Sequence, residues 1–108
     1  MARIVIAEPS GGIRDLLGII VTELGHKAVS VEEADPFVDL VLVEPADGEM
    51  LAAAISLRAR RPDLPLVFVS TVTPSCVTGL EGSATVMKPF RLAELEAAIE
   101  RALSTRET

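Results

Sequence analysis

The chain has few of the residues that mark several common classes of protein. Of its 108 residues none is Trp or Tyr and three are Phe, so a core must be built from Val, Leu, Ile and Ala. Such a core suits parallel strands covered by helices. The single cysteine, Cys76, has no partner for an intramolecular disulfide. No charged and apolar leader and no long apolar run precede the first apolar segment, and we expect a cytoplasmic protein without a membrane partner.

Positive charge is also scarce and scattered along the chain. Ten Lys and Arg residues against sixteen Asp and Glu residues give a formal net charge of −6. Because nucleic-acid binding needs clustered basic residues that neutralise phosphates, we expect no direct contact with nucleic acid. The length suits one compact domain over residues 1–108, and the sequence leaves open whether an output domain follows it.

Short apolar runs, which predict strands, are abundant and alternate with helical patterns. The runs cover residues 3–7, 27–31, 40–43, 66–70 and 84–87. Helical spacing predicts helices over 13–24, from Asp47 to Pro62 and from 92 onward, with a short helix over 73–80. A helical crossover needs about 10 or more residues, so residues 32–38 are expected to form an extended link or one helical turn. This alternation predicts an α/β fold with a five-stranded parallel sheet, and Ile55 and Met87 are expected in its core.

Two of the predicted strands end in carboxylates. Glu8 follows the run 3–7 and Glu44 follows the run 40–43, while Lys88 follows the fifth run. In an open parallel sheet, functional groups collect beyond the carboxyl ends of the strands. Glu44 is therefore either an ion-pair partner of Lys88 or a solvated acid, and we favour the ion pair.

In their order and register these segments resemble the receiver domain of bacterial two-component response regulators. The resemblance covers nearly the whole chain and rests on the motifs RIVIAEPSGGIRDLL, DLVLVE, LPLVFVST and VMKPF. It implies a flavodoxin-like (CheY-like) sheet of strand order 2-1-3-4-5, with a shortened or missing second helix and a short fourth helix. The implied function is that of a signalling domain in a two-component or phosphorelay system, working through protein partners.

The resemblance also assigns roles to single positions. Glu44 stands at the position of the phosphoacceptor aspartate, and Glu8 and Pro9 stand where the family has two consecutive acids. The remaining pocket and switch positions are Ser70, Thr85, Lys88 and Pro89, of which the Lys-Pro bond is usually cis in the family. The implied partner face comprises Cys76, Val77, Leu80, Thr85, Arg91 and Leu95.

The sequence departs from the receiver pattern at the acids. Pro9 offers no carboxylate, and Thr85 replaces the switch aromatic. Glu44 is one methylene longer than an aspartate, which we expect to bring its carboxylate nearer Lys88. Magnesium has lost an expected ligand, so we expect no cofactor and no enzyme activity; Glu8, Glu44 and Asp47 are the weak candidates for a metal site. The prediction is a degenerate pseudo-receiver that works by protein contact without phosphorylation.

Alternatives for the function remain. One is a working phosphoacceptor receiver with magnesium-dependent phosphoryl transfer, against which Pro9 counts. Another is a small-ligand or nucleotide-binding flavodoxin-like module that uses the loop Ser10 to Gly12, although this loop lacks the spacing of known phosphate-binding motifs. A third is a structural or dimerisation element. If the chain is a receiver-like domain, its expected partner is a histidine kinase, an output protein or a second copy of the chain.

Overall fold

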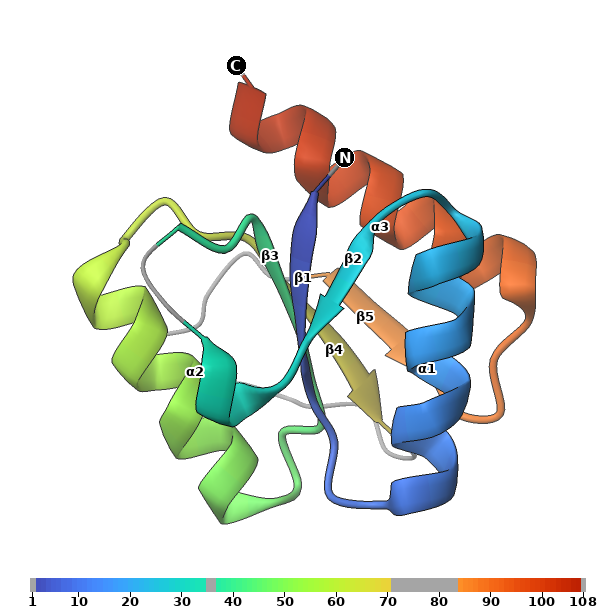
Figure 1. Cartoon of the computed structure of the whole chain (residues 1–108), viewed down its shortest axis with the longest axis horizontal. Coiled ribbons are helices and arrows are strands. Elements are labelled where there is room, and N and C mark those ends of the chain that lie inside the picture. Colours follow the sequence, from blue (N-terminus) through green and yellow to red (C-terminus); the bar gives the residue numbers. More distant parts are fainter. Residues whose placement is uncertain (1, 35–36, 71–83, 108) are drawn as a thin grey trace.

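The computed structural model describes residues 2–34, 37–70 and 84–107. The elements run in the order β1 (Arg3–Ala7), α1 (Gly11–Glu23), β2 (Lys27–Val29), a 3₁₀ turn η1 (Val31–Glu33), β3 (Leu40–Val43), α2 (Gly48–Arg60), β4 (Leu66–Ser70), β5 (Ala84–Met87) and α3 (Leu92–Glu107) (Figure 1). The predicted strands and long helices are therefore confirmed. The short helix predicted over 73–80 lies outside the described residues.

The five strands form one parallel sheet in the order β2-β1-β3-β4-β5, as predicted. The central strands β3 and β4 are buried at every position, and β1 is buried from Ile4 onward. Strands covered on both faces read as continuous apolar runs rather than as alternating ones. This explains why the three runs stand out in the sequence.

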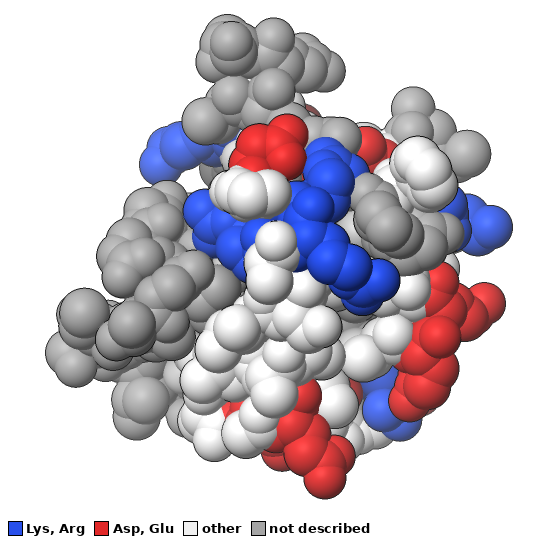
Figure 2. Space-filling view, turned by 90° about the vertical axis from the view of Figure 1, so that its left-hand side faces the viewer, with Lys and Arg blue, Asp and Glu red and all other residues white. Residues whose placement is uncertain are grey.

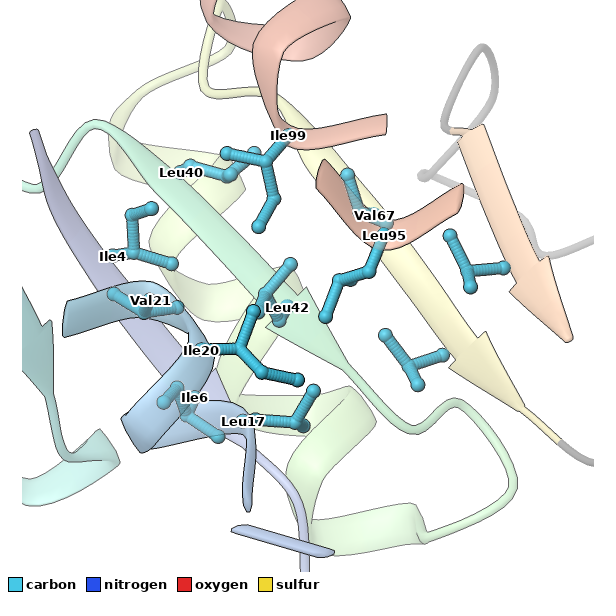
Figure 3. Close-up of a cluster of buried hydrophobic side chains, with 12 residues drawn as sticks. Ile4, Ile6, Leu17, Ile20, Val21, Leu40, Leu42, Val67, Leu95 and Ile99 are labelled. Atoms are coloured by element: carbon cyan, nitrogen blue, oxygen red, sulfur yellow. The ribbon is translucent and has the colours of Figure 1, made fainter. Parts of the chain in front are cut away.

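Helices cover both faces of the sheet, with α1 and α3 on one side and α2 on the other (Figure 1). Side chains alternate between the faces along each strand. Ile4 and Ile6 of β1 belong to the core under α1 and α3, while Val5 and Ala7 belong to the core under α2. In Figure 3, α1 and α3 insert side chains against the first of these faces, including Leu17, Ile20, Val21, Leu95 and Ile99.

The link between β2 and β3 contains one 3₁₀ turn, as predicted for a crossover of this length. A capping box holds the turn: Ser30 Oγ accepts from the Glu33 backbone N–H at 3.3 Å, and the Glu33 carboxylate accepts from the Ser30 backbone N–H at 3.5 Å. The hydrogen bond that the Ser30 hydroxyl donates to the Glu33 carboxylate lowers the pKa of this carboxyl below its usual value, because the bond stabilises the charged form.

Two expected core residues lie on the surface instead. The side of α2 that faces the sheet is defined by Ala54 and Leu57, which leaves Ile55 41% exposed. On β5, Val86 points into the core, so Met87, the next residue of the strand, points outward and is 37% exposed. Within the described ranges, no helix has the length and apolar character that crossing a membrane requires.

Candidate functional site

The carboxyl ends of four adjacent strands bring four polar residues to one edge of the sheet. Glu8 follows β1, Glu44 follows β3, Ser70 ends β4 and Lys88 follows β5. Backbone hydrogen bonds continue between neighbouring strands at this edge: Glu44 N donates to Ala7 O at 3.0 Å, and Lys88 N donates to Ser70 O at 2.7 Å. The parallel sheet therefore places residues that are far apart in the sequence side by side.

Lys88 and the two glutamates form an ionic cluster. Lys88 Nζ donates to Glu8 Oε1 at 2.6 Å and to Glu44 Oε1 at 3.3 Å. The expected contact between Glu44 and Lys88 is therefore present in the structure. Of the two carboxylates, that of Glu8 lies nearer the ammonium group.

Backbone N–H groups also bind the two carboxylates. Each carboxylate uses its second oxygen on its own strand-end loop: Glu8 Oε2 accepts from Ser10 N at 3.1 Å, and Glu44 Oε2 accepts from Ala46 N at 3.3 Å. Each carboxylate therefore bonds both to Lys88 and to a backbone N–H of its own loop. Residue types alone do not identify these two donors, since any residue except proline supplies a backbone N–H.

The cluster is withdrawn from solvent. Glu8 and Glu44 are buried, and the Lys88 side chain is 9% exposed. Buried charges are tolerated only when they are paired and hydrogen-bonded. Here one ammonium faces two carboxylates, so the cluster carries a formal charge of −1 and Lys88 is its sole cation among the described residues.

A divalent cation does not fit these residues well. The oxygens of Glu8 and Glu44 that such an ion needs are hydrogen-bonded to Lys88 and to backbone N–H groups. The third weak candidate, Asp47, is the N-cap of α2 and accepts a hydrogen bond from Met50 N at 2.9 Å. In the described part of the chain, no three His, Cys, Asp or Glu side chains group together as metal ligands would.

The remaining pocket positions are distributed as follows. Pro9 is exposed beside Glu8, and the bond between Lys88 and Pro89 is cis. Ser70 is completely buried at the end of β4. Thr85 is exposed on β5, where it pairs in register with Phe68 of β4.

The predicted partner face is only partly within the described residues. Cys76, Val77 and Leu80 lie outside them, whereas Thr85 and Arg91 are exposed. Leu95 is a correction: it is 0% exposed, because the inward side of α3 runs through Leu95 and Ile99 and packs on the sheet. A partner cannot contact Leu95 without unfolding that core.

The loop Ser10 to Gly12 does not have the geometry of a phosphate-binding loop. Gly11 and Gly12 form the first turn of α1, and Ser10 is its N-cap. Anion-binding nests alternate right-handed and left-handed backbone conformations, yet the positive-φ glycine of the described chain is Gly25, at the end of α1. An open groove of 660 Å³ lies instead along α1 and β2, away from the ionic cluster.

Neither a protein-family model nor a curated protein sequence matches the chain. Its structure is similar to several solved structures. NtrX from Brucella abortus in complex with ADP has a TM-score of 0.81 and 26% identity over 98% of this chain, and the chain spans 27% of the NtrX chain. CheY4, a chemotaxis protein from Vibrio cholerae, has a TM-score of 0.80 and 16% identity, with 95% of this chain and 99% of that chain covered.

A response regulator from Thermotoga maritima is similar as well, with a TM-score of 0.76 and 18% identity, and with 96% of this chain and 98% of that chain covered. At these levels of identity the CheY4 and Thermotoga structures establish the fold. The predicted CheY-like flavodoxin fold, with strand order 2-1-3-4-5, is confirmed, and the structural neighbours of the chain include a chemotaxis protein and a response regulator.

Proposed function

We propose that the chain is a receiver-like signalling domain that works through protein contact and without phosphorylation. The observation that carries this proposal is the ionic cluster, in which Lys88 is already paired with Glu8 and Glu44. In a receiver, the corresponding lysine pairs with the phosphoryl group on the acceptor aspartate. Here the Glu44 carboxylate supplies a permanent negative charge beside Lys88, so the domain holds one charge state.

The acid pair supports the same conclusion. Phosphoryl transfer to a carboxylate needs a divalent cation that offsets the charge of the phosphoryl oxygens, and this cation needs several oxygen ligands. Pro9 contributes none, and the oxygens of Glu8 and Glu44 bond to Lys88. A cation would have to displace the ammonium group to bind. We therefore propose a binding module rather than an enzyme, with no magnesium requirement.

Protein contact is then the remaining means of signalling. Thr85 and Arg91 are exposed at the edge of the sheet and the start of α3, on the face that the resemblance assigns to partners. A kinase or an output protein that binds there would read the fixed shape of the domain. The loss of an aromatic residue at position 85 fits a face that is not coupled to a phosphorylation-dependent switch.

Intact-mass measurement tests the proposal. The wild-type protein is incubated with magnesium and a small acyl phosphate, beside the double variant Pro9→Asp, Glu44→Asp and the matched variant Asp47→Asn. We expect no phosphate mass gain on the wild type or on Asp47→Asn, and a gain on the double variant, in which an acceptor and a second acid are restored. A single-phosphate gain on the wild type, lost in Glu44→Gln, would overturn the proposal and establish a working phosphoacceptor.

A further inference from the structure

The outer side of α2 carries an uncharged stripe. Figure 2 looks onto the side of the molecule where α2 lies, and an uncharged area separates basic side chains above from acidic side chains at the lower edge. The stripe consists of exposed small or apolar residues, namely Ala52, Ile55, Ser56 and Ala59. At its centre Ile55 is 41% exposed, which makes it one of the largest apolar side chains on the surface of the described chain.

The charges at the two ends of this stripe have opposite signs. Glu49 lies in the first turn of α2, and Arg58 and Arg60 lie in its last turn. At 1.5 Å per residue, Glu49 and Arg60 are about 16 Å apart along the helix axis, with Ile55 near the midpoint. Glu49 and Arg60 are exposed, and neither side chain has a hydrogen bond or an ion pair within the described residues.

The helix dipole accounts for part of this pattern. An acid in the first turn and bases in the last turn each stabilise a helix by a few tenths of a kcal/mol to about 1 kcal/mol. The dipole does not account for an uncharged stripe between them, since charged residues there would serve an exposed helix equally well. Small side chains along one face instead allow another helix to approach closely, as at helix interfaces with short interaxial distances.

We propose that two copies of the chain associate through α2, packed antiparallel about a two-fold axis that passes near Ile55. The partner is a second copy of the chain because the charges at the two ends of the stripe are complementary when one α2 helix runs opposite to the other. Reversal places Glu49 of each copy opposite Arg60 of the other, whereas a parallel arrangement would place like charges together. Two-fold dimers of this isologous kind are the commonest oligomers.

This contact is independent of the ionic cluster. It uses the outer side of α2, whereas Lys88 and the glutamates lie at the carboxyl edge of the sheet. It also differs from the partner face around Thr85 and Arg91. A phosphate mass gain on the wild-type protein would therefore overturn the proposed function and leave the dimer proposal standing.

Charge reversal combined with mixing tests the arrangement. Sedimentation velocity over a concentration series at fixed ionic strength should show self-association of the wild type. Glu49→Arg and Arg60→Glu should each dimerise about tenfold or more weakly, because both ion pairs of the two-fold contact become repulsive. An equimolar mixture of the two variants, and the double variant Glu49→Arg, Arg60→Glu, should regain association, since each restores opposite charges at both ends.

A cross-link locates the axis. In a Cys76→Ser background, Ile55→Cys should form a disulfide-linked dimer under mild oxidation, because a residue near a two-fold axis meets its own copy. Ser104→Cys, which is exposed on α3, is the control and should stay monomeric. Wild-type protein that remains monomeric throughout the series overturns the proposal. So does association that Glu49→Arg and Arg60→Glu leave unchanged, because the contact would then lie on another face.

Discussion

Replacing Lys88 with Met removes the cation from the ionic cluster and leaves two buried carboxylates without it. Lys88 Nζ lies 2.6 Å from Glu8 and 3.3 Å from Glu44. At an effective dielectric constant of about 20, these contacts correspond to gross attractions of about 6 and about 5 kcal/mol. The ammonium group regains none of its hydration in the folded protein, so most of this attraction offsets the cost of its burial. Breaking a buried pair from one side has a net cost of about 3 to 5 kcal/mol.

We therefore expect Lys88→Met to lower the free energy of unfolding by about 3 kcal/mol at pH 7. A domain of this size is stable by about 5 to 15 kcal/mol, so the loss is a large part of the total.

Urea unfolding followed by circular dichroism at pH 7 measures this loss. Arg91→Met is the matched control, because Arg91 is exposed two residues after Pro89 and its removal should change stability by less than about 0.5 kcal/mol. The variant Glu8→Gln, Lys88→Met, Glu44→Gln should be more stable than Lys88→Met alone, since no unpaired charge remains. A Lys88→Met loss below about 1 kcal/mol would refute the reasoning.

Three further predictions concern the scaffold. Leu17→Ala should destabilise the protein by about 2 to 5 kcal/mol in urea unfolding, whereas Leu16→Ala, at a position 47% exposed, should cost less than about 1 kcal/mol; equal losses would contradict the packing described for α1. Asp47→Ala should cost about 1 kcal/mol through the lost cap of α2, and Asp47→Asn should retain most of it. Ser30 lowers the pKa of Glu33 in the folded state, so the stabilisation that the Glu33 carboxylate contributes should be complete at neutral pH and disappear as pH falls through the folded-state pKa. An NMR titration in which Ser30→Ala leaves the Glu33 pKa unchanged would contradict this.

Much of the fold could be predicted from the sequence because its strands are buried on both faces. Such strands appear as continuous apolar runs, and the turn residues between them mark their ends. The single helical turn before β3 was predictable from chain length alone, since residues 32–38 cannot form a normal crossover. Ile55 and Met87 were misplaced for a common reason: apolar type was used to infer burial, while burial depends on which side of the element a residue occupies.

The residues that form the site could be predicted from the sequence, but some of their contacts could not. Strand ends in a parallel sheet share an edge, so Glu8, Glu44 and Lys88 could be brought together from their positions after apolar runs. The backbone N–H groups of Ser10 and Ala46 also bond to the two carboxylates, and residue identity says nothing about these contacts. Leu95 was wrongly placed on the partner face because that face was assigned to a whole segment, without regard to which side of α3 faces the sheet.

The same three side chains bear on both stability and signalling. The ionic cluster joins the ends of β1 and β3 to the residue after β5, so a cation that entered to support phosphoryl transfer would first have to break contacts that hold this edge together. In a switchable receiver the acidic site must remain open to such a cation. A buried lysine paired with two glutamates favours a fixed edge instead, because release of either carboxylate leaves a charge without its partner in a region of low exposure. Under the proposed function, the contacts that stabilise this edge are therefore the ones that oppose its use as a phosphorylation switch.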